Sequence, residues 1–369
     1  MKPQLIIHIG RPKVGSTALQ GFLNQNRDAL AKQGVCYPKT GLYHGASHHF
    51  SLVFLPGLPD YAVVQDLDPD QLYATLAQEV VASGLSRAVI SSENFWLVKP
   101  DRLKPLLNER FDVKIVAYLR RQDEVMVSSF VQEIRGGMLS LDTPMDEYLA
   151  DKGRLKLLDY DAVLANWEAA FGIENVSVRL FEAMEAGIER DFLALFGLDA
   201  DRDFRFSEAR RNASPALDLL RMLETLRGYP VGEVAHRQLS GILTEVSEQL
   251  GIEDGFDAKR LISSAQRRQV MASFEASNRR LFERHDCDGH RFPEVVAAAD
   301  EAAPEIPDLN REQRALLGVI AYQQRQIQIL INRVSHLERS KGGPIVVEAP
   351  RAAPGPGFFR GLLRRLGLG

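Results

Sequence analysis

Cysteine, long apolar runs and an excess of positive charge are all scarce in this sequence. Only Cys36 and Cys287 occur among 369 residues, which excludes a disulfide framework or a cysteine-rich metal site. No stretch approaches the ~20 apolar residues of a membrane-spanning helix. The apolar run at 5–9 is shorter than the ~7–15-residue apolar region of an export signal. The 45 basic residues are outnumbered by 49 acidic ones, which argues against a general nucleic-acid binder. We therefore expect a cytoplasmic protein with a soluble main body.

The length allows one large domain with appendages or two domains. From residue 3 to about 292, short apolar runs alternate with helical patterns. The runs are expected to form central parallel strands at 5–10, 87–92, 113–119 and 175–181. Helices are expected at 16–33, 70–83, 123–136, 157–171 and 183–196, followed by a mainly helical region at 214–284. Segment 39–68 is expected to be a long irregular loop. The alternation predicts an α/β fold with a doubly wound, mainly parallel sheet.

The pattern changes after this main domain, which we place at 1–292. A linker rich in Ala, Glu and Pro follows at 293–308. Apolar residues on alternating three- and four-residue steps then predict a helix over 309–340: Leu309, Leu316, Ile320, Ile327, Leu330, Val334 and Leu337. This pattern favours a coiled coil and a homo-oligomer. The alternative is one amphipathic helix packed back on the domain.

The C-terminal end consists of two segments that differ in composition. Segment 341–357 is rich in Gly and Pro and predicts a linker without a packed core. The tail 358–369 combines apolar residues with arginines, a pattern typical of helices that lie at a membrane surface. On this interpretation the protein is peripheral at the inner membrane. The alternative is a frayed tail, because two glycines weaken helix formation.

The most informative stretch joins the first predicted strand to the first predicted helix. It reads Gly10-Arg11-Pro12-Lys13-Val14-Gly15-Ser16-Thr17. In such a turn, backbone N–H groups close on an anion at the positive end of a helix dipole. Lys13 adds a positive charge, and Ser16 and Thr17 add hydroxyl donors. The stretch therefore predicts a phosphate-binding loop.

This loop departs from the G-x-x-x-x-G-K-[ST] pattern of nucleotide triphosphatases. Gly10 and Gly15 have the required separation, but Ser16 stands where the lysine belongs. The second predicted strand ends in Ser91-Ser92-Glu93, with no clear aspartate to hold Mg²⁺. ATP hydrolysis is therefore disfavoured, although a P-loop kinase of a small molecule stays open as an alternative.

The stretch Ile7 to Thr17, followed by Phe22-Leu23 and Gly34 to Pro38, resembles the start of the bacterial sulfotransferases that use 3′-phosphoadenosine-5′-phosphosulfate (PAPS). Their loop typically reads K-T-G-[ST]-[ST], and Val14 replaces its threonine here. The resemblance covers roughly the first three-quarters of the chain. It implies a fold of the P-loop sulfotransferase type, PAPS as co-substrate and no required metal. It also implies donor-binding residues in the loop: Arg11, Lys13, Gly15, Ser16 and Thr17.

A second anion site is predicted at the end of the third strand. Arg120 and Arg121 follow this strand, and the next helix carries Ser128 and Ser129. A guanidinium and a hydroxyl on the first turns of a helix suit a phosphate dianion. In the sulfotransferases, an arginine here and a serine eight residues later bind the 3′-phosphate of the donor. Both Arg120–Ser128 and Arg121–Ser129 have this spacing, and we prefer the first pair. The resemblance implies a further basic contact from Arg211.

Two candidates exist for the general base that takes the proton of the acceptor. Glu93 follows the second predicted strand, at the sheet edge where parallel sheets bind ligands. His48 and His49 lie in the irregular segment after the first helix, close to His44. No cysteine or carboxylate completes a metal-ligand set with these histidines. We rank Glu93 first and His49 second. The alternatives are a strand-end salt bridge for Glu93 and a solvated loop for the histidines.

Together these features predict a sulfotransferase that moves a sulfuryl group from PAPS to a hydroxyl or amine. The acceptor is expected to be a glycan, a glycolipid or a small molecule. Lys13 is expected to neutralise charge on the bridging oxygen as the leaving phosphate departs. The alternatives are the small-molecule kinase and a non-catalytic scaffold that oligomerises through 309–340. No nucleic-acid partner is expected.

Overall fold

The computed structural model describes residues 2–10, 13–136, 138–206, 217–230, 233–250, 258–295 and 308–341. Several features predicted from the sequence lie outside these residues. They are Arg11, Arg211, most of the linker 293–308, all of segment 341–357 except Lys341, and the tail 358–369.

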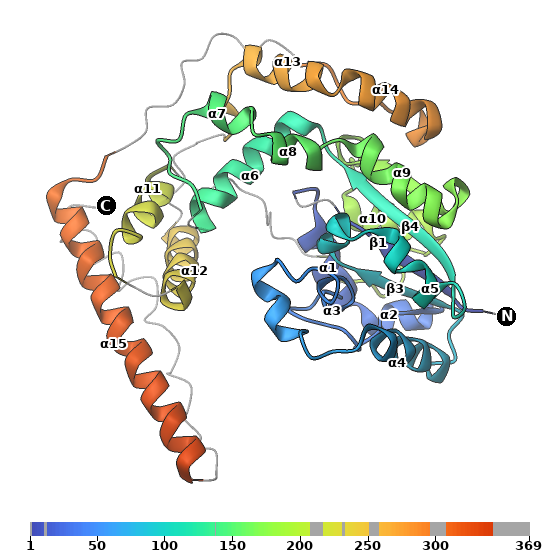
Figure 1. The fold of residues 1–369 in the computed structure, drawn as a ribbon, viewed down its shortest axis with the longest axis horizontal. Coiled ribbons are helices and arrows are strands. Elements are labelled where there is room, and N and C mark those ends of the chain that lie inside the picture. Colours follow the sequence, from blue (N-terminus) through green and yellow to red (C-terminus); the bar gives the residue numbers. More distant parts are fainter. Residues whose placement is uncertain are drawn as a thin grey trace. The chain divides into compact units, whose positions relative to one another are not determined.

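Within the described residues, five strands form one parallel sheet in the order β2-β3-β1-β4-β5. Strands β1, β3 and β4 are labelled in Figure 1. The strands are β1 (Gln4–His8), β2 (Val35–Cys36), β3 (Arg87–Ser91), β4 (Asp112–Leu119) and β5 (Val176–Leu180). The predicted parallel α/β fold is confirmed. Strand β2 is missing from the sequence prediction because two residues are too few to show a periodicity.

The central strand β1 is covered on both faces. Leu5, Ile6 and Ile7 are all completely buried, although successive side chains of a strand point to opposite faces. A strand of this kind has no polar alternation, so its sequence is a continuous apolar run.

Helices lie between the strands along the chain. Those in the compact unit that holds the sheet are α1 (Ser16–Gln25), α2 (Arg27–Lys32), α3 (His49–Leu52), α4 (Pro69–Ala82), α5 (Lys104–Leu107), α8 (Lys152–Leu157), α9 (Tyr160–Phe171), α10 (Ile188–Leu195), α13 (Ser264–Ser273) and α14 (Glu275–Arg284). The predicted helix 16–33 is divided at Asn26, whose side-chain amide donates to the carbonyls of Phe22 and Arg205. The predicted loop 39–68 contains the short helix α3 and a 3-10 helix at Pro59–Val63.

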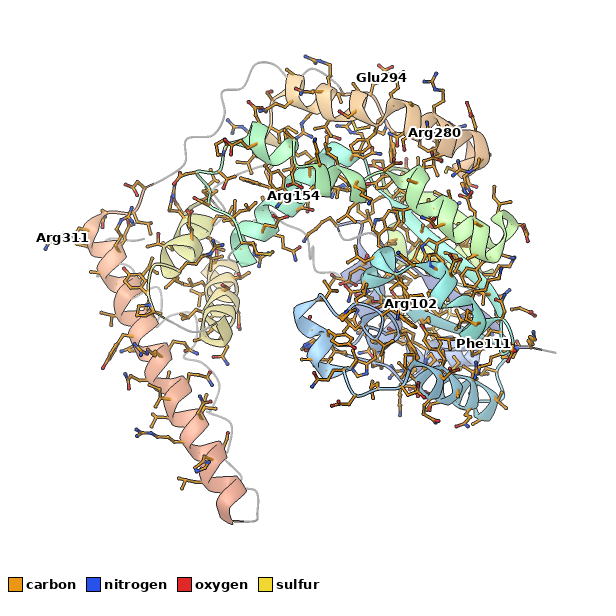
Figure 2. The ribbon with its side chains drawn as sticks, viewed as in Figure 1. Arg102, Phe111, Arg154, Arg280, Glu294 and Arg311 are labelled. Atoms are coloured by element: carbon orange, nitrogen blue, oxygen red, sulfur yellow. The ribbon has the colours of Figure 1, made fainter. Side chains whose placement is uncertain are left out.

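Helix α9 packs against β4 and β5, and α14 packs on α9. Two arginines of α14 bind two acids of α9. Arg280, labelled in Figure 2, donates to Asp161 at 2.7 Å, and Arg284 donates to Glu168 at 2.8 Å. These ion pairs attach residues more than a hundred positions downstream to the helix layer of the sheet.

The chain forms two compact units, and each draws on separate stretches. The first contains 1–126, 149–211 and 264–298, and the second contains 127–148, 212–263 and 299–369. Helices α6 (Gln122–Gly136) and α7 (Met145–Leu149) run across the divisions. The domain boundaries given above stay a prediction.

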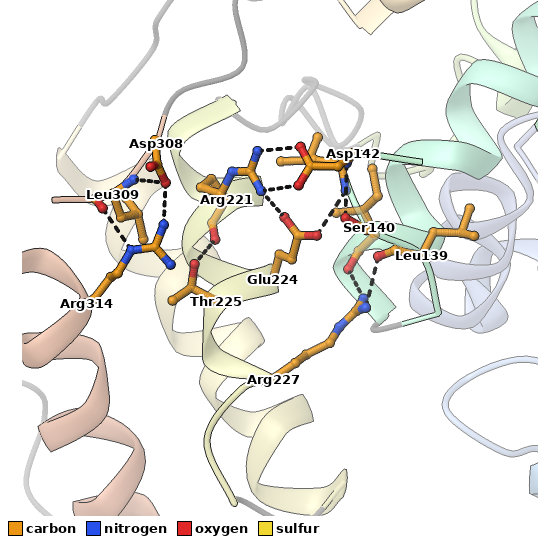
Figure 3. Close-up of polar contacts among 12 residues, drawn as sticks. Leu139, Ser140, Asp142, Arg221, Glu224, Thr225, Arg227, Asp308, Leu309 and Arg314 are labelled. Atoms are coloured by element: carbon orange, nitrogen blue, oxygen red, sulfur yellow. Dashed lines mark hydrogen bonds and ion pairs between the residues drawn. The ribbon is translucent and has the colours of Figure 1, made fainter. Parts of the chain in front are cut away.

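The second unit is helical in its described part, with α11 (Leu217–Leu226), α12 (Glu233–Leu250) and α15 (Arg311–Lys341). Its polar contacts are shown in Figure 3. Arg221 donates to both Asp142 and Glu224, and Arg227 donates to the carbonyl oxygen of Leu139 at 2.9 Å. These bonds hold the 139–142 turn against α11.

The predicted helix over 309–340 is confirmed as α15. In its first part, Leu317 and Ala321 are buried in a cluster with Leu226 of α11 and Leu239 of α12. Farther along, three heptad positions are exposed: Ile327 at 48%, Leu330 at 58% and Leu337 at 49%. The first part of α15 therefore packs back on its own chain, and the later part keeps its apolar positions exposed. Among the described helices, none is long and apolar enough to span a membrane.

Candidate active site

The predicted phosphate loop joins β1 to α1 in the structure. Two of its residues have left-handed backbone conformations, Lys13 with φ 75° and Gly15 with φ 82°. Gly15 immediately precedes α1, and a Cβ at this position would lie 3.2 Å from the ring of Phe181. Left-handed residues in a loop turn backbone N–H groups toward a common concavity that binds anions. The strain at Lys13, a non-glycine residue, is of the kind found at ligand-binding loops.

The side chains of the loop face different surroundings. Ser16 is buried at the first turn of α1, whereas Thr17 is exposed. Lys13 is half-buried. Val14, the position at which the loop departs from the sulfotransferase pattern, is completely buried. Its side chain therefore packs inside the protein.

Arg120 lies directly after β4 and contacts the phosphate loop. Its guanidinium donates to the backbone carbonyl of Lys13 at 3.5 Å and forms an ion pair with Glu124. The same group lies over the ring of Phe181, 5.3 Å from its centre. Tyr160 donates to the Arg120 carbonyl at 2.8 Å, which holds the backbone at this strand end. These contacts keep a cation beside the loop.

Arg121, the other arginine of the pair, has a different environment. Its guanidinium donates twice to Asp123 at 2.7 Å, and it also donates to the carbonyls of Pro293 and Glu294. Asp123 is completely buried and accepts a further bond from Arg267 at 2.7 Å. Burial alone would raise the pKa of Asp123, but the bonds from the two arginines outweigh burial and lower it. Arg121 therefore belongs to a buried ionic cluster.

The serines of the predicted second anion site lie on α6. Ser128 and Ser129 are both half-buried. They belong to stretch 127–148, which is part of the second compact unit. The arginines that share their predicted spacing belong to the first unit. The role of Ser128 stays a prediction.

Glu93 follows β3 and begins a 3-10 helix, Glu93–Leu97. Its Oε2 accepts a hydrogen bond from Gln20 Nε2 at 2.7 Å. Gln20 lies on α1, so the carboxylate is connected to the helix that starts at the phosphate loop. The side chain of Glu93 keeps 30% of its surface exposed, which leaves it accessible to a substrate.

His48 lies beside this carboxylate. Its Nε2 is 4.0 Å from Glu93 Oε1, and its Nδ1 shares a hydrogen bond of 2.8 Å with Ser92 Oγ. Ser51 Oγ lies 2.8 Å from Ser92 Oγ and donates to the His48 carbonyl. Burial lowers the pKa of His48 more than the negative charge of Glu93 raises it. These surroundings therefore favour the neutral form of the ring.

His49, the second-ranked candidate for the base, is placed differently. Its ring stacks on Tyr43 with centres 5.8 Å apart, and the ring of His44 packs on the same tyrosine. His48 rather than His49 is the histidine next to Glu93. Within the described residues, no group of three or more His, Cys, Asp or Glu side chains is arranged to hold a metal ion.

Three residues of this region are absent from the sequence prediction. Gln20 and Ser92 hold the two base candidates, and His8 lies at the end of β1. The sequence could have pointed to Gln20, because this polar residue lies on α1 one turn after Ser16, on the side of the helix whose other residues are buried. A signal for His8 is a polar residue inside a fully buried strand, immediately before the loop.

Comparison with known proteins adds the following findings. No family model matches the chain. An uncharacterised protein of Archaeoglobus fulgidus is 27% identical over 202 residues, which is 53% of this chain. The chain spans about half (52%) of the length of that curated relative.

Three solved structures are similar to the chain. A sulfotransferase from Alicyclobacillus acidocaldarius is 22% identical, with a TM-score of 0.40, over 65% of this chain and 95% of that one. The sulfotransferase domain of the Synechococcus PCC 7002 olefin synthase is 16% identical, with a TM-score of 0.33, over 54% and 74%. The sulfotransferase domain of the curacin biosynthetic pathway is 14% identical, with a TM-score of 0.35, over 74% and 98%. All three are sulfotransferases.

Proposed function

We propose that this protein is a sulfotransferase that transfers a sulfuryl group from PAPS to a hydroxyl or amine. One observation carries the proposal. Two cations follow neighbouring strands of the sheet, Lys13 after β1 and Arg120 after β4. The candidate base Glu93 follows β3, on the other side of β1, and His48 from the segment after β2 lies beside it. Ligands of open α/β sheets bind at the carboxyl ends of the strands, so these groups flank one site.

The loop fits one phosphate of a nucleotide donor. Its left-handed residues and the start of α1 offer backbone N–H groups, and Lys13 offers a charge. Arg120, next to the loop, fits a second phosphate through a planar guanidinium that binds two oxygens at once. Two anion sites side by side suit a 3′,5′-bisphosphate better than a single phosphate chain. Ser16 and Thr17 are proposed as hydroxyl donors to the phosphate in the loop.

Sulfuryl transfer requires positioning and charge stabilisation more than covalent catalysis by the protein, as phosphoryl transfer does. The donor supplies the sulfuryl group, which passes from a phosphate oxygen to the acceptor oxygen or nitrogen. Lys13 stabilises the charge that develops on the phosphate as it leaves. Glu93 takes the proton of the acceptor. Gln20 donates a hydrogen bond to its Oε2, and His48 lies 4.0 Å from its Oε1.

The experiment that tests this function compares ligands by thermal shift. A sulfotransferase is stabilised by 3′-phosphoadenosine-5′-phosphate (PAP), the product that the donor leaves, without added metal. A small-molecule kinase is stabilised by ATP with Mg²⁺ instead. A scaffold without activity responds to neither ligand. Transfer of radioactive sulfate from labelled PAPS to a panel of glycans, glycolipids and small alcohols then identifies the acceptor.

We propose that the later part of α15 joins two or more copies of the chain. The exposed heptad positions Ile327, Leu330 and Leu337 continue the three- and four-residue steps that begin at Leu309. A helix with such a stripe associates with an equivalent helix because burial removes apolar surface from water. The basic tail 358–369 supports a further proposal, contact with an anionic membrane surface near a lipid-linked acceptor.

A further inference from the structure

His8 is the last residue of β1 and lies between the two neighbouring strands. Its side chain is completely buried. Nδ1 shares a hydrogen bond of 2.7 Å with the Ser91 hydroxyl of β3. On the other side, the ring packs edge-on against Tyr118 of β4, with centres 5.5 Å apart. These contacts fix the orientation of the imidazole.

The free edge of this imidazole faces the first residue of the phosphate loop. A Cβ placed on Gly10 would lie 3.0 Å from His8 Nε2, 2.8 Å from its Cε1 and 2.6 Å from Ser16 Oγ. Nε2 is buried and has no hydrogen-bond partner among the described residues. His8 Nε2 and the Ser16 hydroxyl therefore both lie next to the place that a side chain at position 10 would fill. Because residue 10 is glycine, no side chain fills that place.

The protonation state of His8 follows from its surroundings. Burial lowers its pKa to about 3, so the ring is neutral at pH 7. Either the Ser91 hydroxyl or the imidazole can donate in the bond at Nδ1. When Ser91 donates, the proton of the neutral ring resides on Nε2. A buried N–H group is almost always paired, so this one requires an acceptor. Lys13 and the start of α1 attract an anion to the same loop.

We propose that His8 is a ligand-binding residue of the phosphate loop and that its Nε2–H donates to an oxygen of the bound anion. This inference rests on the proposed function for the identity of the anion. Because Arg120 is assigned to the 3′-phosphate, the anion in the loop is the 5′-phosphate. Ser91 positions the imidazole for this bond.

Two substitutions test the roles of the two ring nitrogens separately. His8→Asn keeps an amide near Nδ1, where it still reaches Ser91, but removes the donor at Nε2. His8→Gln places its amide nitrogen near Nε2 and keeps the donor. Calorimetric titrations with PAP and with adenosine 3′-phosphate give the gain in affinity that the 5′-phosphate provides. We expect this gain to fall about tenfold in His8→Asn, as for one lost hydrogen bond to a charged group, and to be restored in His8→Gln.

Arg120→Ala is the matched control. It should lower the gain from the 3′-phosphate, measured with PAP against adenosine 5′-phosphate, much more than the gain from the 5′-phosphate, because its one bond to the loop is long at 3.5 Å. If folded His8→Asn gains as much affinity from the 5′-phosphate as the wild-type protein does, the proposal for His8 is overturned and the proposed function still stands. A wild-type protein that does not bind PAP would instead overturn the proposed function.

A spectroscopic readout on the wild-type protein covers the case in which the variants do not fold. In protein labelled with ¹⁵N-histidine, the His8 signals report a neutral ring with its proton on Nε2. Titration with inorganic pyrophosphate, or with PAP, should shift that proton downfield as it gains an anionic acceptor. A proton on Nδ1, or an Nε2–H signal that does not move at saturation, would refute the role of His8.

Discussion

Gln20 Nε2 lies 2.7 Å from Glu93 Oε2, so the helix that starts at the phosphate loop also holds the carboxylate at the end of β3. The bond connects residues 73 positions apart in the chain. It places the proposed acid–base group in a fixed relation to the proposed anion site.

The acid–base pair is tested by Glu93→Gln and His48→Asn. Loss of a general base is expected to lower turnover by ~10²–10⁴-fold, with the smaller loss for His48, because it acts on Glu93. The dissociation constant for PAP should stay near wild type. His49→Ala serves as the control, since His49 stacks on Tyr43, and should keep most of its turnover. Full turnover in Glu93→Gln, or its loss in His49→Ala alone, would move the base to another residue.

Lys13→Ala tests charge stabilisation by the loop. We expect turnover with PAPS to fall by ~10²–10³-fold, the range found when one group that stabilises developing charge is removed. Lys32→Ala is the matched control, because Lys32 is an exposed lysine paired with Asp203 away from the loop. Steady-state kinetics of both variants decide the matter. Unchanged kinetics in Lys13→Ala would contradict the phosphate-loop assignment.

The two neighbouring arginines should behave differently. Arg120→Ala is expected to weaken PAP binding at nearly unchanged stability, because Arg120 is assigned to the 3′-phosphate. Arg121→Ala should lower the free energy of unfolding by about 3 kcal/mol, because it removes one partner of the buried Asp123 and leaves Arg267 as the other. Denaturant unfolding and calorimetric titration of both variants measure the two effects. The reverse result would assign the 3′-phosphate to Arg121 instead.

Acid should destabilise the protein through His8. Its pKa is about 3 in the folded protein against an ordinary value of 6.5, so the unfolded chain binds the proton first. The contribution of the neutral His8 ring to the free energy of unfolding is complete above pH 6.5 and is lost as the pH falls toward 3. The loss attributable to His8 is about 3 kcal/mol between pH 7.5 and 4.5. Urea unfolding of wild type and His8→Gln at both pH values isolates it, because the variant lacks the titrating group. An equal loss in both proteins would refute this assignment.

The self-association of α15 is tested by Leu330→Glu. Leu330 is at an exposed heptad position, so a charge there should reduce an oligomer to monomers. The control is Arg325→Glu, which changes charge on the outer side of the same helix and should not alter the assembly. Light scattering after size-exclusion chromatography gives the mass of each. If the wild-type protein is monomeric at all concentrations, this face of α15 does not bind a second copy of the chain.

Much of the fold follows from sequence patterns with local causes. A fully buried parallel strand requires consecutive apolar residues, which is why Leu5 to Ile7 could be assigned to a strand. The phosphate loop could be found because its left-handed backbone at Gly15 requires glycine. Periodicity is enough to identify α15 as a helix. It does not say that Leu317 and Ala321 pack on α11 and α12 while Leu330 stays exposed.

The candidate site was predictable only in part. Spacing alone could not separate Arg120 from Arg121, because both follow the same strand and both have a serine eight residues later. Their difference lies in distant partners: Arg121 binds backbone at Pro293 and Glu294 and shares Asp123 with Arg267. In the same way, the choice between His48 and His49 depends on Ser92 and Glu93, which reach the histidines only through the folded chain.

Local sequence patterns account for the parallel strands, the loop with its glycines and lysine, and the long C-terminal helix. These depend on residues within a few positions of one another, through periodicity and backbone conformation. Which polar side chains meet at the sheet edge, and which are enclosed in ionic clusters, depends on the folded chain. That choice depends on groups brought together from distant positions, and burial then sets their charge, as it does for His8 and Asp123.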